Sequence, residues 1–343
     1  MRLFAVSVLG AIASFLLAGV FYFAREYYLT ASKDTAVILS ANLATIKSRE
    51  IRQFIQSDKK QKEITLLFVG DIMLSRAVGA KIKNQDDPRF PFLKIADEIK
   101  SADLAFGNLE SPISEKGKNQ GSIYSFRADP GVAAGLKFAG FDVLSLANNH
   151  IFDWGSIALV DTVEILKNSG IDSVGAGKDE FNANAPLVKQ VGDTKIAFLA
   201  FTNLYPKSLE ADADKPGISH FDIPGIKKAI RELKKSNDIV VVSLHWGEEY
   251  KINSNDVQKD LARALVEVGA DLIVGHHPHV VQEIERSQNS WIAYSLGNFV
   301  FDQSFSKETM EGLILKVKIK NKKVFEVEPV KIKINSDFQP FIE

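Results

Sequence analysis

From Glu63 to the C-terminus the chain alternates short apolar runs with amphipathic stretches, and this alternation limits the possible folds more than any other feature. The apolar runs have the length of strands, whereas the stretches between them carry apolar residues at helical spacing. Several of the helical stretches end in a glycine just before the next strand, as helices commonly do. Helix–glycine–strand units in series predict an α/β layered fold built around a sheet.

The predicted strands are residues 64–71, 102–110, 141–150, 194–201, 238–247, 270–277 and 290–299, and the predicted helices are residues 130–140, 156–170, 223–236 and 257–270. Residues 312–334 differ, because apolar and polar residues alternate there at period two around the sequence "KNKK". That pattern predicts antiparallel strands joined in a hairpin. Since no long linker or low-complexity tract interrupts residues 63–343, one domain is the simplest interpretation.

Polar side chains gather where the predicted strands end. In open α/β sheets, sites form outside the carboxyl ends of the strands, where successive loops converge. Five of the six histidines lie in these clusters, and only His220 lies elsewhere. The clustered donors are Asp71, Asn108, Glu110, Asn149, His150, His245, His276, His277 and His279. Carboxylates combined with imidazoles suit Mn, Fe, Zn or Ni better than Ca or Mg alone, so the sequence predicts a divalent-metal site.

The charge and cysteine content exclude several other classes of protein. With 42 basic and 43 acidic side chains the formal net charge is −1, which lacks the basic surplus of a nucleic-acid binder. The chain has no cysteine, which excludes disulfides, thiolate metal ligands and cysteine nucleophiles. The absence of cysteine also suits a compartment in which free thiols would be oxidised.

The N-terminus predicts a membrane anchor. Residues 3–24 carry no charge over 22 positions, and at roughly 1.5 Å per residue such a helix crosses a bilayer core of roughly 30 Å. An uncleaved anchor at residues 1–29 is favoured over a cleaved signal peptide, whose apolar region is shorter. Residues 30–62 then form a helical stalk, and residues 63–343 the folded domain. We expect a single-pass protein of the cell membrane with its body outside the cytoplasm.

Six sequence motifs occur in order along the predicted domain. They are "FVGDIMLSR" (68–76), "FGNLESPI" (106–113), "LANNHIFDWG" (146–155), "LHWGEEY" (244–250), "VGHHPHVVQ" (274–282) and "YSLGNFVFD" (294–302). Together they resemble the CapA family of poly-γ-glutamate capsule synthesis proteins, which are metallophosphatase-like relatives of the calcineurin-like metallophosphoesterases. The resemblance implies a four-layer α/β/β/α sandwich with a metal centre at the strand ends.

The resemblance also implies roles for particular residues. Asp71 matches the first metal-binding aspartate, Asn149 the asparagine ligand and His150 the catalytic histidine. His245 matches the isolated histidine ligand, and the histidines of "GHHPH" match the final G-H-x-H pair. The implied chemistry is hydrolysis by a metal-activated water, with a histidine stabilising or protonating the leaving oxygen. Asp153 either orients the ring of His150 or takes part in a turn.

The motifs depart from the superfamily pattern in three places. The D-x-H motif has Met73 in place of its histidine, and the G-D-x-x-D motif has lost its bridging aspartate, for which Glu110 is the nearby substitute. The extra residue in "GHHPH" leaves either His276 or His277 to pair with His279. We favour His277, because Pro278 restricts it to extended geometry. The implied cofactor is a divalent metal, Mn, Fe or Zn, with one ion supported and a second left open.

Two functions from different classes compete. The first is a membrane-anchored, metal-dependent hydrolase of phosphoesters or of a related bond, acting in capsule polymer synthesis or export. The second is a metal-containing binding or assembly subunit for poly-γ-glutamate or another anionic polymer, with little turnover. Asn108, Arg76 and Arg127 are the candidate substrate-binding residues, the arginines because they can grip a phosphate or a polyanionic chain. Other membrane proteins of capsule synthesis are the implied partners.

Overall fold

The computed structural model describes residues 19, 46 and 63–342. Gly19 and Ile46 are helical, and the predicted anchor and stalk otherwise lie outside the described residues. Among the residues that are described, no helix combines the length and the apolar character needed to cross a bilayer. The folded domain, Glu63–Glu343, is a compact unit by itself, and all that follows concerns this unit.

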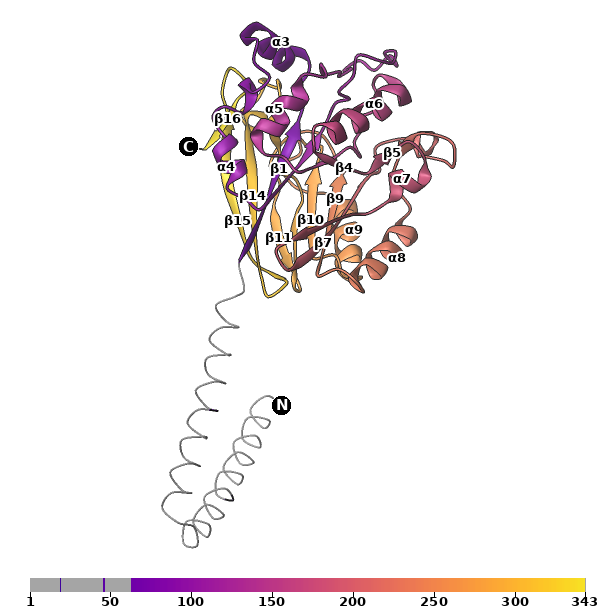
Figure 1. Ribbon diagram of the computed structural model, residues 1–343, viewed down its shortest axis with the longest axis vertical. Helices are drawn as coiled ribbons and strands as arrows, with labels where there is room; N and C mark the ends of the chain where they lie inside the picture. The colour runs from indigo at the N-terminus through magenta and orange to yellow at the C-terminus, as the bar shows by residue number, and fades with distance from the viewer. Residues whose placement is uncertain (1–18, 20–45, 47–62, 343) are drawn as a thin grey trace. The chain divides into compact units, whose positions relative to one another are not determined.

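Strands and helices are interspersed along the chain as far as α9, after which β10 to β16 follow with only one short 3₁₀ turn between them (Figure 1). The helices are α3 (Arg76–Gln85), α4 (Ala96–Lys100), α5 (Val132–Ala139), α6 (Gly155–Asn168), α7 (Glu180–Asn184), α8 (Ile223–Lys234) and α9 (Asp256–Val266). The strands are β1 (Ile64–Ile72), β2 (Leu104–Leu109), β3 (Val143–Ser145), β4 (Asp172–Val174), β5 (Ala176–Gly177), β6 (Leu187–Val191), β7 (Thr194–Thr202), β8 (Gly217–Ile218), β9 (Ile239–His245), β10 (Leu272–His276), β11 (Ile284–Ser287), β12 (Ser290–Ala293), β13 (Asn298–Val300), β14 (Glu311–Lys320), β15 (Lys323–Ile334) and β16 (Pro340–Ile342).

Most strands belong to two mixed sheets. The first has the order β16-β15-β14-β1-β2-β3-β4, with β13 also paired to β1. In it β1, β2, β3 and β4 run parallel, whereas the C-terminal strands are antiparallel. The second has the order β11-β12-β10-β9-β7-β6, with a parallel centre of β12, β10, β9 and β7. In both sheets the parallel strands direct their carboxyl ends to one edge, which is where a site is expected.

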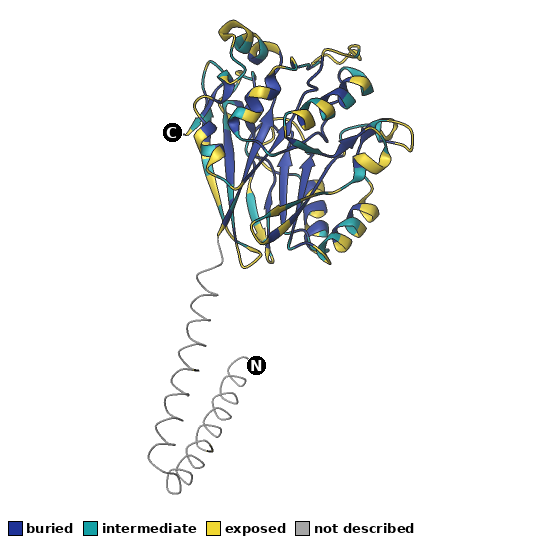
Figure 2. Cartoon of the chain, in the orientation of Figure 1, coloured by how far each residue is buried: buried dark blue, intermediate teal, exposed yellow. Residues whose placement is uncertain are grey.

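The two sheets pack face to face, and helices cover their outer faces. Along β1, Leu66 and Phe68 enter a core shared with β7, β9 and β10 of the second sheet, whereas Leu67 and Val69 enter a core shared with α5 and α6. A third core lies between the second sheet and the helices α8 and α9. Figure 2 shows the strands largely buried and the helices exposed on one side. The predicted α/β fold is therefore confirmed in its mixed sheets, with helices packed against them.

The four helices predicted from the sequence are all present. Gly140, with φ of 100°, follows α5, and Gly170, with φ of 70°, follows α6. Because an L side chain rarely adopts such angles, glycine ends each helix and turns the chain toward the next strand. The C-terminal hairpin is also confirmed, since β14 and β15 pair antiparallel around a turn at Asn321 and Lys322.

Two predicted strands are wrong in extent. Residues 141–150 were expected to form one strand, but only β3 (Val143–Ser145) pairs, and the following residues leave the sheet in a turn. Residues 290–299 were expected to form another, but β12 belongs to the second sheet and β13 to the first. The chain therefore crosses from one sheet to the other between Ala293 and Asn298, a change of partner that the apolar character of these residues does not reveal.

Candidate metal centre

The donors predicted from the sequence meet where the two sheets present their carboxyl ends. Asp71 near the end of β1 lies in register with Asn108 of β2. On the other sheet, His245 at the end of β9 lies in register with His276 at the end of β10. Loops of both sheets thus contribute to a single buried cluster, as the positions of strand ends in an α/β fold require.

Asn108 lies at the centre of this cluster. Its Nδ2 donates to Oδ1 of Asp71 at 2.8 Å, and lies 3.3 Å both from Oε2 of Glu110 and from Nδ1 of His245. Its Oδ1 accepts from Nδ2 of Asn148 at 3.2 Å. Because Asn108 is fully buried, we interpret it as a residue that positions the carboxylates, whereas the sequence suggested contact with substrate.

A first group of possible ligands consists of Asp71, Glu110 and His245. One donor atom from each lies within 4.8 Å of the others, and all three residues are buried. Oε1 of Glu110 makes no hydrogen bond, although it is shielded from solvent. A buried carboxylate oxygen without a partner is costly, so this position fits a cation.

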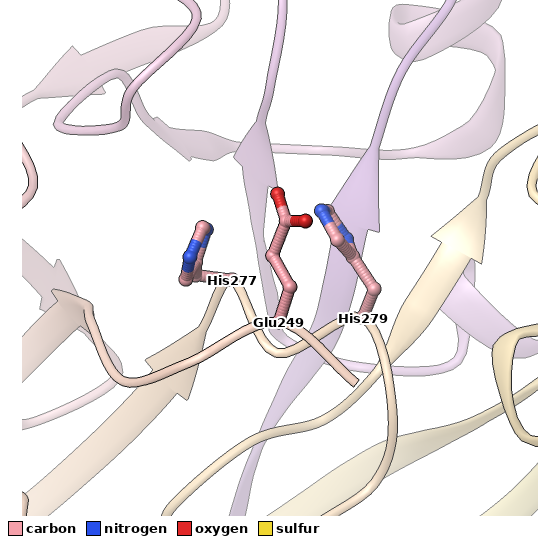
Figure 3. Close-up of side chains that lie close together, drawn as sticks. All are labelled: Glu249, His277 and His279. Atoms are coloured by element: carbon pink, nitrogen blue, oxygen red, sulfur yellow. The ribbon is translucent and has the colours of Figure 1, made fainter. Parts of the chain in front are cut away.

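A second group consists of Glu249, His277 and His279, whose donor atoms also lie within 4.8 Å of one another. Figure 3 shows the Glu249 carboxylate between the two imidazole rings. Both histidines are buried, whereas Glu249 is exposed. His276 belongs to neither group, but its Nδ1 lies 3.4 Å from Oδ1 of Asp71 and neither of its ring nitrogens makes a hydrogen bond.

The carboxylates of the cluster respond differently to their surroundings. Burial alone would raise the pKa of Asp71, but the imidazoles of His276 and His279, at 3.4 and 3.3 Å from its oxygens, lower that pKa well below its ordinary value. Burial raises the pKa of Glu110 well above its ordinary value, and the charge of Asp71 raises it further. A cation would relieve this repulsion between two buried carboxylates.

Two imidazoles of the cluster, those of His245 and His277, have lowered pKa values. Burial lowers the pKa of His245 well below its ordinary value, and His277 adds to this effect. Burial likewise lowers the pKa of His277 to about 3, with His279 contributing. A metal ion binds only an unprotonated imidazole nitrogen, so the rings of His245 and His277 do not have to lose a proton before they bind a metal ion.

Asn149 and His245 form a direct pair between the two sheets. Nε2 of His245 donates to Oδ1 of Asn149 at 2.7 Å, while Nδ1 of the same ring accepts from Asn108. Asn149 follows β3 in the first sheet, whereas His245 ends β9 in the second. The two residues predicted as ligands therefore lie side by side at the expected edge.

His150 is held by a separate set of contacts. Its Nδ1 donates to Oδ2 of Asp153 at 2.7 Å, and the same oxygen accepts the backbone N–H of Phe126 at 2.7 Å. The ring of Phe126 stacks on the imidazole with centroids 3.9 Å apart. Of the two roles considered for Asp153, orienting the ring is the one that these contacts support. With Nδ1 bonded to Asp153, Nε2 is the nitrogen that can exchange a proton.

The prediction for His277 was wrong in its backbone geometry. Its φ is 96°, whereas Pro278 was expected to keep it extended, and His279 also has a positive φ of 56°. The backbone N–H of His277 donates to Oδ2 of Asp71 at 3.2 Å, which favours the turned conformation. A strained backbone of this kind costs on the order of 1–3 kcal/mol and is typical of functional sites.

Asn298 orients His279, and the sequence analysis did not identify it. Nδ1 of His279 donates to Oδ1 of Asn298 at 3.0 Å, which leaves Nε2 facing Oε1 of Glu110 at 3.5 Å. Two other side chains were missed, namely Asn148 and Glu249. All three lie inside quoted motifs, so their positions were visible but their roles were not.

Replacing Asn298 with Ala is expected to weaken Mn²⁺ binding by about 10–100-fold, because an outer partner fixes the orientation and protonation of a ligating imidazole. Isothermal titration of the full chain with Mn²⁺ measures the effect. Gln303→Ala, which removes a different contact of Asn298, serves as the control and should change the affinity little. Equal affinity in Asn298→Ala and the unaltered chain would contradict the orienting role.

The two predicted substrate-binding arginines lie outside the cluster. Arg76 forms an ion pair with Asp302 at 3.2 Å, and its guanidinium lies 5.3 Å from the centre of the Phe126 ring. Arg127 lies over the Trp154 ring at 3.4 Å. Both arginines line a cavity of about 520 Å³. Neither Phe126 nor His150 lines this cavity, although Arg127 follows Phe126 directly in the chain and Arg76 contacts the Phe126 ring.

A larger cavity, of about 650 Å³, lies on the outer side of the second sheet. Phe201 of β7, Phe181 of α7 and Ile226 of α8 contribute to its lining, together with His220. None of the candidate ligands lines it. We therefore locate the chemistry at the strand ends rather than at the larger cavity.

Comparison with known sequences places the chain in a family. Residues 65–303 match the family described as bacterial capsule synthesis protein PGA_cap. The chain belongs to this family. The match includes every predicted ligand, from Asp71 to His279, and ends before the β14–β15 hairpin.

Two curated relatives illustrate the membership. The chain is 36% identical over 265 residues to the capsule biosynthesis protein CapA of Bacillus anthracis, a match that covers 75% of this chain and 64% of that protein. It is 37% identical over 270 residues to the PGA biosynthesis protein CapA of Bacillus subtilis (strain 168), covering 77% and 70% respectively. The similarity thus spans about two thirds of the length of these family members.

A solved structure resembles the fold. A candidate 5′-nucleotidase of Staphylococcus aureus, solved in complex with α-ketoglutarate, superposes with a TM-score of 0.51 at 15% identity. The superposition covers 82% of this chain and 54% of that one. At this identity the likeness concerns the fold alone. The shared feature is the arrangement of mixed α/β sheets described above.

Proposed function

We propose that the protein is a membrane-anchored, metal-dependent phosphoesterase of the four-layer metallophosphoesterase type that acts in poly-γ-glutamate capsule synthesis or export. The observation that carries the proposal is the buried donor cluster beside the oriented His150. Membership of the capsule synthesis family supports the polymer context, as do the names of the two CapA relatives.

The donor set fits a divalent cation. Asp71, Glu110 and His245 offer oxygen and nitrogen atoms within 4.8 Å of one another, and one buried oxygen of Glu110 makes no hydrogen bond. Carboxylate and imidazole ligands together suit Mn, Fe or Zn. When bound, such a cation supplies Lewis-acid activation of the ester and of the attacking water.

The protein's own residues then perform the remaining tasks. His150 exchanges a proton at Nε2, because Asp153 holds Nδ1, and this proton goes to the oxygen of the leaving group. Asn108 holds Asp71 and Glu110 in place. Arg76 and Arg127, at the cavity of about 520 Å³, attract the negative charge of the substrate.

A non-catalytic role as a polymer-binding subunit of the capsule machinery is the second candidate. The observation that favours it is the pair of arginines, Arg76 and Arg127, in a cavity whose lining also includes Lys83 and three aspartates. The retained pairing of His150 with Asp153 favours catalysis, because a pure binding protein has no need of an oriented imidazole. We therefore rank the enzyme first.

Location at the cell membrane follows from the uncharged residues 3–24, which we propose to anchor the protein with its body outside the cytoplasm. Contact with other membrane proteins of capsule synthesis belongs to the same proposal.

The first test of function uses the full chain purified without chelator. We expect bound divalent metal by mass spectrometry and Mn²⁺-dependent hydrolysis of bis(p-nitrophenyl) phosphate or p-nitrophenyl phosphate. Bound metal and polymer binding without hydrolysis would favour the second candidate, whereas absence of metal would contradict both.

A further inference from the structure

Two loops that follow neighbouring strands run side by side at the edge of the second sheet. The backbone N–H of Trp246, just after β9, donates to the carbonyl of His276 at 3.1 Å. Four residues later, the N–H of Tyr250 donates to the carbonyl of Pro278 at 2.8 Å. Glu249 immediately precedes Tyr250, and Pro278 separates His277 from His279. These bonds therefore fix the Glu249 backbone beside both histidines.

Three residues of these loops have unusual backbone angles. Tyr250, His277 and His279 have positive φ values of 63°, 96° and 56°, which non-glycine residues rarely adopt. Their conformations place the Glu249 carboxylate between the two imidazoles (Figure 3). Local strain of this kind persists only where surrounding contacts impose it.

The histidines of this group have nitrogens available for a ligand. Nδ1 of His277 is shielded from solvent and has no hydrogen-bond partner, and the residue is only 7% exposed. Nδ1 of His279 donates to Asn298, so Nε2 carries the lone pair. A buried imidazole nitrogen without a partner is costly unless something binds to it.

The group also lies in an excess of negative charge. Oδ2 of Asp71 lies 3.3 Å from Nδ1 of His279, Oε1 of Glu110 lies 3.5 Å from its Nε2, and the Glu249 carboxylate lies within 4.8 Å of the ring, so three carboxylates surround this imidazole. Among the residues that the structure describes, none of these carboxylates forms an ion pair with lysine or arginine. A cation bound beside these carboxylates would offset their charge.

Met73, which occupies the histidine position of the D-x-H motif, does not contribute to such a position. Its sulfur accepts from the backbone N–H of Ser75 at 3.2 Å and from the hydroxyl of Ser75 at 3.1 Å. Met73 is fully buried among apolar residues. The first motif has therefore lost a ligand, and the carboxylate that faces the two histidines comes from another loop.

We propose that Glu249, His277 and His279 form a second cation position, in which Glu249 supplies a carboxylate that the family motifs do not assign to metal binding. This inference rests on the proposed function, because it requires that the strand ends bind metal at all. The first position, at Asp71, Glu110 and His245, is buried on all sides, whereas Glu249 is exposed. The second ion is therefore the one that exchanges with solvent and meets the substrate.

The test is the stoichiometry of Mn²⁺ on the full chain, measured by isothermal titration and by mass spectrometry after gel filtration. The unaltered chain is expected to bind two ions per molecule. Glu249→Gln should retain one and bind the other at least about 10-fold more weakly, because one of its ligands loses its charge. The matched control is Glu248→Gln, which removes the neighbouring exposed carboxylate and should still bind two ions.

A second variant distinguishes the loss of a metal position from misfolding. His277→Ala should also bind a single ion, and the double variant with Glu249→Gln should bind the same single ion, because both residues serve one position. Circular dichroism in EDTA checks that each variant folds like the unaltered chain. Two ions bound by Glu249→Gln with unaltered affinity, or only one bound by the unaltered chain, would overturn the inference and leave the proposed function standing. No ion on the unaltered chain would overturn the proposed function itself.

Discussion

Replacing His150 with Ala is expected to lower Mn²⁺-dependent hydrolysis of a phosphodiester with an alkoxide leaving group by about 10²–10⁴-fold, the usual contribution of a positioned general acid. His150 belongs to neither group of candidate ligands, so the metal content of the variant should equal that of the unaltered chain. Steady-state kinetics with parallel metal analysis measures both quantities. A variant that loses its metal along with its activity would show that His150 binds the ion instead.

Asp153→Asn provides the companion measurement. The carboxylate accepts both from Nδ1 of His150 and from the backbone N–H of Phe126, and an amide cannot reproduce both contacts without a change of orientation. We expect the rate to fall by about 10-fold or more, with metal content unchanged. Full activity in Asp153→Asn would mean that the observed pairing serves only the turn.

Replacing Gly275 with Ala is expected to destabilise the domain by about 3 kcal/mol, the upper range for forcing an atom into a packed interior. A Cβ at Gly275 would lie 1.9 Å from the carbonyl oxygen of Tyr294 and 2.6 Å from Nε1 of Trp246. That nitrogen donates to the same carbonyl at 3.0 Å, so the added methyl would separate a buried donor from its acceptor. Urea unfolding followed by circular dichroism measures the loss.

The measurement is made in EDTA, so that a change in metal affinity does not contribute to the result. Gly131→Ala is the control, since Gly131 is exposed with a φ of −60° and its nearest neighbour is the Asp129 side chain at 3.0 Å. It should change the free energy of unfolding by less than about 1 kcal/mol. Similar unfolding midpoints in the two variants would contradict the close packing around Gly275.

Much of the architecture could be predicted because burial repeats along each element. The alternation of Leu66, Leu67, Phe68 and Val69 between two cores requires β1 to be covered on both faces, and the apolar run already indicated this. The change of sheet between β12 and β13 could not be predicted in the same way. Both strands are buried and apolar, so nothing in the local sequence distinguishes their partners.

The site was predictable in its donors but not in its contacts. The histidines and Asp71 were identifiable because imidazole and carboxylate at strand ends are rare outside functional sites. Glu249 was not, because a glutamate in a polar loop usually faces solvent, and only the backbone bond between Tyr250 and Pro278 brings it to the histidines. Asn298 was missed for a similar reason, since its partner His279 lies 19 residues earlier and reaches it only in the folded chain.

The candidate ligands come from both sheets, so metal binding would affect how firmly the two sheets are held together. Asp71 and Glu110 come from one sheet and its loops, and His245 and His279 from the other. An ion bound by Asp71, Glu110 and His245 would link the two sheets, so that they could not separate without releasing it. At a free ion concentration 100 times the dissociation constant, such binding would add about 2.7 kcal/mol to the free energy of unfolding. The melting temperature would then depend on the metal concentration, and metal-free chains would be the most susceptible to proteolysis.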